Sequence, residues 1–185
     1  MPANTAQQLN HVELVYRPGE RALAARLFEL LGFRVMDRGG MFLSAFVDAG
    51  TSDFLNNALY ASEVTPEQWA LDRALLDDFD GDDRVGAAAR EYLGRLADEP
   101  QRSSHFGIRY PDLDQLETTL AAIESAGRDD PELGGRVSVS GVFRPGDPGA
   151  YTDVMVQAFV KTDVVAAGLL AFGQHVELQW HLPAQ

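Results

Sequence analysis

The chain of 185 residues contains no cysteine. This absence excludes disulfide bonds, zinc–thiolate sites and catalysis by a thiol, and it fits a reducing compartment. No cluster of Lys and Arg occurs, and the formal net charge is −13. A nucleic acid is therefore not an expected partner, because phosphate backbones are bound by clustered cations.

Long apolar runs are also missing from the sequence. No stretch of about 18 apolar residues occurs, so we expect no membrane-spanning segment and no membrane partner. The first residues lack the charged and then apolar pattern of a secretory signal, so the cytoplasm is the expected location. The hydrophobic content of 45% is ordinary for a globular protein. A chain of this length can form one large domain or two small halves that share a core.

Three short segments that begin with histidine are the most informative feature that is present. The letters His-Val-Glu-Leu occur at residues 11–14 and again at residues 175–178. A similar segment, His-Phe-Gly-Ile-Arg-Tyr, begins at His105. Each segment has the composition of a strand. The repetition indicates a duplicated β-rich module with a metal site or a catalytic site between the two copies.

The first module is predicted to have the order β-α-β-β-β. Its helix carries an apolar stripe and ends at Gly32, a residue typical of a helix C-terminus. A hairpin is expected around Gly39 and Gly40. The strands are expected at residues 10–16, 33–36, 41–47 and 57–64.

The second module repeats this order. Its helix shows the apolar stripe Leu113, Leu116, Leu120 and Ile123, and Gly127 is predicted to close it. The strands are expected at residues 104–110, 136–142, 154–161 and 175–181.

Between the modules lies an insertion that is predicted to be helical. Thr65, Pro66 and Gln68 form the pattern of a helix N-terminus with a capping box. A second helix is expected over residues 84–97. We therefore predict one compact domain in three parts: a first module (residues 1–64), the insertion (residues 65–100) and a second module (residues 101–185).

This order of motifs resembles the vicinal oxygen chelate superfamily, which includes glyoxalase I, bleomycin-resistance proteins and extradiol dioxygenases. The resemblance covers nearly the whole chain outside the insertion. It implies an α+β fold in which two βαβββ modules pair into a cup-shaped, half-open barrel. In that family a single metal ion lies in the cup and is bound by the first and last strands of the modules.

Carried over position by position, the resemblance implies that His11, His105 and Glu177 are the metal ligands. A fourth position falls at Leu59 or Tyr60, neither of which is a usual ligand, and Glu63 reaches it only if the strand is shifted. Two histidines and one carboxylate with open positions suit Fe(II), and Mn, Ni or Zn remain alternatives. Proton competition with the two imidazoles would make the binding pH-dependent.

Side-chain alternation places further groups on the same face of the strands as the ligands. His175, Glu13 and Tyr60 are the candidates for acid–base or supporting roles. The alternative is that they are rim residues without a catalytic role.

The function implied by the resemblance is a metal-dependent enzyme, most like a dioxygenase that acts on a small aromatic or keto-enol substrate. Two alternatives stay open: a glyoxalase-type lyase or isomerase, and a non-catalytic protein that binds a small molecule such as an antibiotic. In the superfamily, ring-cleaving members use a further His in the second module and a Tyr shortly before the carboxylate of the last strand. No His lies between His105 and His175, and Tyr151 is far upstream of Glu177, so the sequence argues against ring cleavage in particular. A small molecule is the expected partner, and a homodimer is a further alternative.

Overall fold

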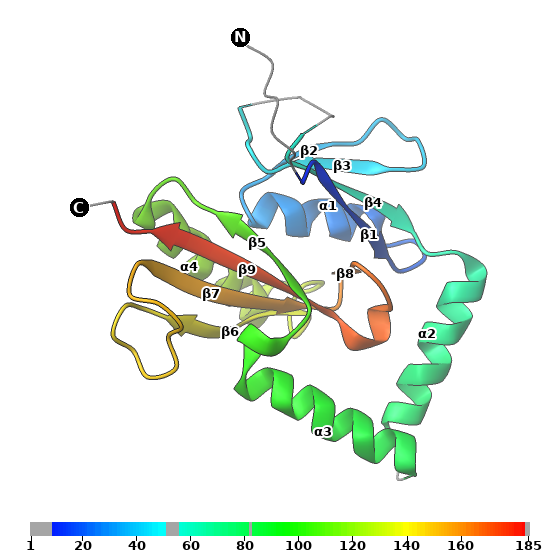
Figure 1. Ribbon diagram of the computed structural model, residues 1–185. Helices are drawn as coiled ribbons and strands as arrows, with labels where there is room; N and C mark the ends of the chain where they lie inside the picture. The colour runs from blue at the N-terminus through cyan, green and yellow to red at the C-terminus, as the bar shows by residue number, and fades with distance from the viewer. Residues whose placement is uncertain (1–8, 51–55, 82, 184–185) are drawn as a thin grey trace.

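Each half of the chain folds into a βαβββ module, and the two modules lie side by side (Figure 1). The computed structural model describes residues 9–50, 56–81 and 83–183. The first module consists of β1 (His11–Tyr16), α1 (Arg21–Leu30), β2 (Arg34–Met36), β3 (Leu43–Phe46) and β4 (Ala58–Glu63). In its sheet β1 runs parallel to β4, whereas β2, β3 and β4 pair antiparallel.

The second module has the same topology. It consists of β5 (His105–Arg109), α4 (Leu113–Asp129), β6 (Val137–Phe143), β7 (Met155–Thr162) and β9 (Gln174–His181). Its strand order, β5-β9-β7-β6, matches the order β1-β4-β3-β2 of the first sheet, and again the first and last strands are parallel. The predicted α+β fold with two such modules is confirmed. The two sheets do not join into a closed barrel.

A short strand ties the modules together, and the sequence pattern did not predict it. Residues 162–174 contain the helical turn η2 (Leu170–Phe172). The same segment also contains β8 (Val165–Ala166), which pairs antiparallel with Val15 and Tyr16 of β1. The chain of the second module thereby extends the sheet of the first.

Both sheets pack one face against helices, and these faces share one hydrophobic core. Leu14, Leu27, Leu116 and Leu178 are buried members of this core. Because side chains alternate along a strand, the residues next to Leu178 on β9 point to the opposite face of the sheet. The phenol of Tyr110 is buried between the modules, where it donates a hydrogen bond to the carbonyl of Leu31 at 2.7 Å.

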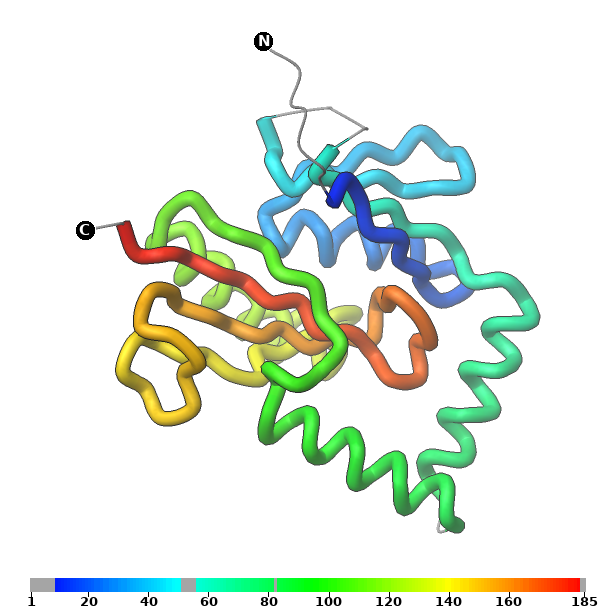
Figure 2. Tube along the Cα trace, viewed as in Figure 1, coloured from blue at the N-terminus to red at the C-terminus, as the bar shows by residue number. Residues whose placement is uncertain are grey.

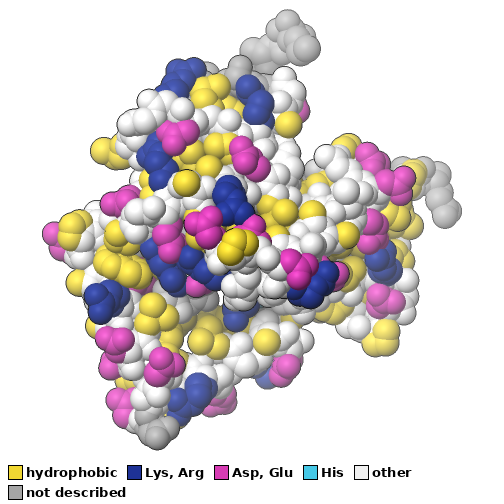
Figure 3. Space-filling model, turned by 180° about the vertical axis from the view of Figure 1, so that it is seen from behind, with side chains coloured by type: hydrophobic (Ala, Val, Ile, Leu, Met, Phe, Trp, Pro, Cys, Tyr) yellow, Lys and Arg dark blue, Asp and Glu magenta, His cyan; other side chains and the backbone are white. Residues whose placement is uncertain are grey.

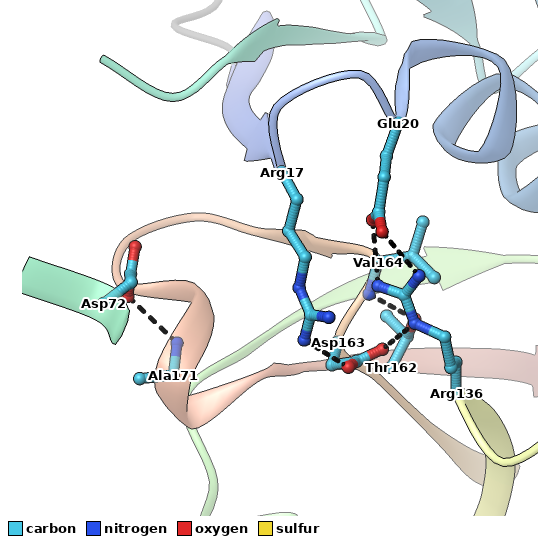
Figure 4. A network of polar contacts seen from close by, with 8 residues as sticks. All are labelled: Arg17, Glu20, Asp72, Arg136, Thr162, Asp163, Val164 and Ala171. Atoms are coloured by element: carbon cyan, nitrogen blue, oxygen red, sulfur yellow. Dashed lines mark hydrogen bonds and ion pairs between the residues drawn. The ribbon is translucent and has the colours of Figure 1, made fainter. Parts of the chain in front are cut away.

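A chain of alternating charges joins the modules at the end where β8 pairs with β1 (Figure 4). Arg17 contacts Asp163 at 2.5 Å, and Asp163 also accepts a hydrogen bond from Arg136 at 2.8 Å. The guanidinium of Arg136 binds both carboxylate oxygens of Glu20, at 2.8 and 2.9 Å. Such bidentate pairs are the stronger kind of ion pair, so this network supports the relative position of the modules.

The insertion forms two helices that extend away from the sheets (Figure 2). Thr65 caps α2 (Pro66–Phe79) by accepting a hydrogen bond from the backbone N–H of Gln68 at 3.2 Å, as predicted. Within α2, the buried carboxylate of Asp72 accepts a hydrogen bond from the backbone N–H of Ala171 at 3.0 Å. The second helix, α3 (Arg84–Asp98), leads into the short turn η1 (Pro100–Arg102).

One helix end differs from the prediction. Helix α4 continues to Asp129, so Gly127 lies inside it and does not close it. A Cβ at Gly127 would lie 2.3 Å from the carbonyl oxygen of Val137, so glycine is required there for close packing of the helix on β6.

Two features bear on partners. Within the described ranges, no helix is both long enough and apolar enough to cross a bilayer. On the face shown in Figure 3, cationic and anionic side chains are intermixed rather than gathered by sign.

Candidate functional site

The side of the second sheet that faces away from α4 carries an unusual set of polar residues. The strand register places His105 beside His175, and His175 beside Lys161, in one row across the sheet. In the next row Gly107 lies beside Glu177, and Glu177 lies beside Phe159. We call this surface the polar face, and we define it by His105, Gln157, Lys161, His175 and Glu177.

His105 is held in one orientation. Its Nδ1 atom lies 2.9 Å from the backbone carbonyl oxygen of Ser103, and its ring meets the ring of Phe159 edge-on, with centroids 5.3 Å apart. A carbonyl only accepts hydrogen bonds, so Nδ1 carries the proton, and in the neutral ring Nε2 is left with a lone pair. The side chain is 25% exposed, so a ligand can reach it.

Glu177 lies beside this lone pair. Its side chain is only 6% exposed, and Oε2 is 3.4 Å from Nε2 of His105. Its other oxygen, Oε1, accepts a short hydrogen bond from the amide of Gln157. Gly107 makes room for the carboxylate, because a Cβ at this position would lie 3.3 Å from Oε2. The carboxylate is thus fixed on one side and open toward His105.

The pair formed by His105 and Glu177 fits two ligand positions of one divalent ion. Two ligand atoms that are each about 2.1 Å from a tetrahedral ion lie roughly 3.4 Å apart. A backbone carbonyl that fixes the other nitrogen of a histidine is also the usual support for a metal-binding imidazole. A neutral imidazole nitrogen and a carboxylate are both acceptors, so a proton or a cation is needed between them.

The structure does not bring His11 into a group with this pair. The Nδ1 atom of His11 lies 2.8 Å from Oδ1 of Asn10, and Nε2 lies 3.9 Å from the carboxylate of Glu13. His11 and His105 do line the same pocket of about 260 Å³ between the modules. Nevertheless, among the residues that the structure describes, no three His, Asp or Glu side chains form a group that could hold a metal ion.

The other candidates of the first module lie around His11. Tyr60 pairs with Glu13 across β4 and β1, and its ring centroid is 5.6 Å from that of His11. The strand is not shifted, because Glu63 pairs with Tyr16 at the far end of β1. Its carboxylate there accepts a hydrogen bond from the backbone N–H of Gly19 at 2.8 Å, so Glu63 does not supply a fourth ligand.

His175 is a buried member of the polar face. It is 4% exposed, and its Nε2 atom has no hydrogen-bond partner among the described residues. Burial, together with the smaller effects of the charges of Lys161 and His105, lowers the pKa of His175 to about 4. The ring is therefore neutral at physiological pH, and it forms part of the floor of the site.

Two residues of the polar face were missed at the level of the sequence. Gln157 carries no signal, because its role depends on the pairing of β7 with β9. Lys161 does carry one: it is the only lysine of the chain, and the other 14 of the 15 Lys and Arg residues are arginine.

Comparisons with known proteins give distant likenesses only. No protein-family profile and no curated protein sequence matches the chain. A protein of Bacillus anthracis described as belonging to the glyoxalase family is 10% identical, with 97% of this chain and 98% of that chain covered and a TM-score of 0.47. A hypothetical protein of S. aureus is 9% identical, with coverages of 96% and 95% and a TM-score of 0.45. The oxidase ChaP-H2 is 14% identical, with coverages of 96% and 95% and a TM-score of 0.44.

Proposed function

We propose that this protein is an enzyme that acts on a small molecule with the help of a divalent metal ion bound by His105 and Glu177. The observation that carries the proposal is the pair itself. Nε2 of His105 and Oε2 of Glu177 are 3.4 Å apart, and each side chain is held by a further contact, to Ser103 and Gln157 respectively. Such preorganisation is typical of a site rather than of a surface ion pair.

The surroundings of the pair favour a small organic substrate. His105 lines the pocket between the modules together with His11, Val12, Leu59 and Ile108, so the pocket is mostly apolar with a few polar groups. This composition is typical of a small-molecule site. A substrate with two neighbouring oxygen atoms, such as a catechol-like or keto-enol compound, would suit it.

Each residue of the proposed site has a distinct role. His105 and Glu177 hold the ion and leave its remaining positions to the substrate, and Gln157 keeps the carboxylate turned toward His105. When bound, a redox-active ion such as Fe(II) would support dioxygen chemistry, whereas Zn, Ni or Mn would polarise a substrate oxygen. His11, from the other wall of the pocket, is the candidate for a third ligand.

The test is a titration of metal-free protein with Co(II), followed by its visible absorption, and with Fe(II) under anaerobic conditions. The variants are His105→Ala, Glu177→Gln and His11→Ala. His181→Ala is the matched control. His181 lies on the same strand as Glu177, but its Nε2 atom is hydrogen-bonded to Oε1 of Gln179 at 3.1 Å. We expect His105→Ala and Glu177→Gln each to weaken binding at least 10- to 100-fold, about the loss caused by removing a supporting group of a metal site.

The proposal fails if the wild type does not bind metal, or if His105→Ala and Glu177→Gln bind it as the wild type does. The variant His11→Ala decides a separate question. A loss equal to that of His105→Ala would make His11 the third ligand, and an unchanged affinity would restrict the ligands of this chain to the pair.

A second candidate is a metal-independent isomerase or lyase. The observation that favours it is the carboxylate beside an imidazole that has one fixed proton, because such a pair can exchange a proton with a substrate. In that case Glu177→Gln would abolish turnover of a keto-enol compound in the presence of chelator. A protein that binds its ligand without turning it over would show neither metal affinity nor turnover.

A further inference from the structure

The only lysine of the chain lies on the polar face. Lys161 is half-buried on β7, directly beside His175 and two strands from His105. Adjacent strands are about 4.8 Å apart, so the backbones of Lys161 and His105 are roughly 10 Å apart.

The ammonium group of Lys161 has no anionic partner among the residues that the structure describes. Across the described part of the chain, no ion pair and no hydrogen bond involves its side chain. The chain has 28 Asp and Glu residues, and Arg17, Arg21, Arg26 and Arg136 all bind carboxylates. The Nζ atom of Lys161 is not among the buried polar atoms, so this ammonium, which has no carboxylate partner among the described residues, is available to an anion from solution.

A second observation points to the same place. His175, between Lys161 and His105, is buried and its Nε2 atom has no partner among the described residues. Among the described residues, the row from Lys161 to His105 therefore contains a cation without a carboxylate partner, a buried imidazole nitrogen without a hydrogen bond, and a histidine whose Nε2 atom faces Glu177. Buried polar groups are normally satisfied, so the Nε2 atom of His175, between these two side chains, is a second indication of a ligand site.

We propose that Lys161 binds an anionic oxygen of the substrate, a carboxylate or an enolate, while the oxygen atoms that react lie at His105 and Glu177. The substrate is then a small organic anion rather than a neutral compound. The placement of the reacting end rests on the proposed function, whereas the need of Lys161 for an anion rests on its own contacts. Lysine suits this role because its compact ammonium is a point charge on a flexible stem.

The experiment compares two probes of the same shape, salicylate and its neutral amide, salicylamide. Their binding to the full chain is measured by calorimetry for the wild type, Lys161→Met and Lys161→Arg. Arg84→Met is the control for the loss of one positive charge, because Arg84 is exposed at the start of α3. A charge-assisted hydrogen bond accounts for about a tenfold difference in affinity or more.

We expect the wild type and Arg84→Met to bind salicylate at least about tenfold more tightly than salicylamide. Lys161→Met should lose this preference, and Lys161→Arg should keep most of it. No binding of salicylate, equal binding of both probes by the wild type, or a preference that survives in Lys161→Met would each overturn the proposal.

A chemical measurement avoids dependence on the folding of a variant. An amine reagent such as formaldehyde with a borohydride can modify only Lys161 and the α-amino group, because the chain has no other lysine. Salicylate should slow the modification of Lys161, as followed by mass spectrometry of peptides, and salicylamide should not. Equal rates with both probes would contradict the proposal.

The variant His105→Ala separates this proposal from the proposed function. If both hold, His105→Ala weakens both probes and leaves the preference for the anion in place. If His105→Ala binds both probes normally while Lys161→Met loses the preference, Lys161 is an anion site and the role of His105 is wrong.

Discussion

The two modules share a topology but differ in the side chains on the face of each sheet that points away from its helix. In each, the first strand runs parallel to the last, and the register allows the residues to be matched one by one. His11 corresponds to His105, and Ala58 corresponds to His175. The side chain of His11 is 41% exposed and that of His105 is 25% exposed, so the same position is more enclosed in the second module.

The carboxylates show the difference most clearly. Glu13 and Tyr60 of the first module correspond to Gly107 and Glu177 of the second. The carboxylate lies on the first strand in one module and on the last strand in the other. Glu13 is 54% exposed, whereas Glu177 is 6% exposed and fits over a glycine.

This contrast teaches that duplication of the fold does not duplicate the site. A common backbone places side chains at equivalent positions, but the chemistry depends on which residues occupy them and on how far they are enclosed. The second module carries an oriented pair with a buried carboxylate, and the first presents exposed groups across a shared pocket. The following predictions test this difference, from the largest expected effect to the smallest.

The largest effect should come from His175, whose counterpart in the first module is Ala58. Its pKa of about 4 in the folded state lies below the unperturbed value of 6.5, because burial and the neighbouring charges of Lys161 and His105 disfavour its protonation. Stability should therefore be lost as the pH falls from about 6.5 to about 4, by roughly 3 kcal/mol, since the unfolded chain binds a proton that the folded chain does not. Urea unfolding measured across this range for the wild type and His175→Gln checks it.

In the variant His175→Gln this loss of stability at low pH should be absent, because glutamine has no group to protonate there. His11→Gln, at an exposed position of the first module, should retain the full dependence. A wild type and a His175→Gln variant with parallel pH profiles would contradict the shifted pKa.

A smaller effect is expected where the two modules are joined. Arg136 is 20% exposed and binds Glu20 and Asp163, so Arg136→Met should remove the ion-pair partner of Glu20 and leave Asp163 paired with Arg17 alone. We expect a loss of about 2 kcal/mol in the free energy of unfolding, reduced from the value for a fully buried pair because the groups are partly solvated. Arg144→Met is the control: its pair with Glu117 is 45% and 40% exposed, and its loss should stay below about 1 kcal/mol. Equal losses in chemical denaturation would show that the network does not hold the modules together.

The smallest effect on stability is expected at Gly107. An added Cβ would lie 3.3 Å from the carboxylate of Glu177, so Gly107→Ala should displace that carboxylate by a few tenths of an ångström. The stability should change by less than about 1 kcal/mol, whereas Co(II) binding should weaken severalfold, since ligand geometry is sensitive to such shifts. The matched variant Glu13→Ala should change neither. If Gly107→Ala binds Co(II) as the wild type does, the fit between Gly107 and Glu177 has no part in the site.

Much of the fold could be predicted from local patterns. Alternating strands, the apolar stripe through Leu116 and Leu120, and the helix N-cap at Thr65 are short-range features, so their signals lie within a few residues of each other. The strand β8 could not be found this way, because it has two residues and exists only through its pairing with β1. The prediction for the end of α4 was wrong for a related reason. Gly127 lies inside the helix, where it allows close packing on Val137 of β6, and a contact between two elements is not visible in a local pattern.

The sequence by itself determined the modular order, the histidines that begin β1 and β5, and the carboxylate of β9. It also determined the scarcity of lysine, which is a property of composition. The tertiary structure alone decided which of these groups meet. His105 and Glu177 come together because β5 and β9 are neighbours in one parallel pair, and His11 stays apart from them because it belongs to the other sheet. Burial likewise arises only from packing, so the neutral state of His175 and the isolation of Lys161 follow from the folded chain and not from its letters.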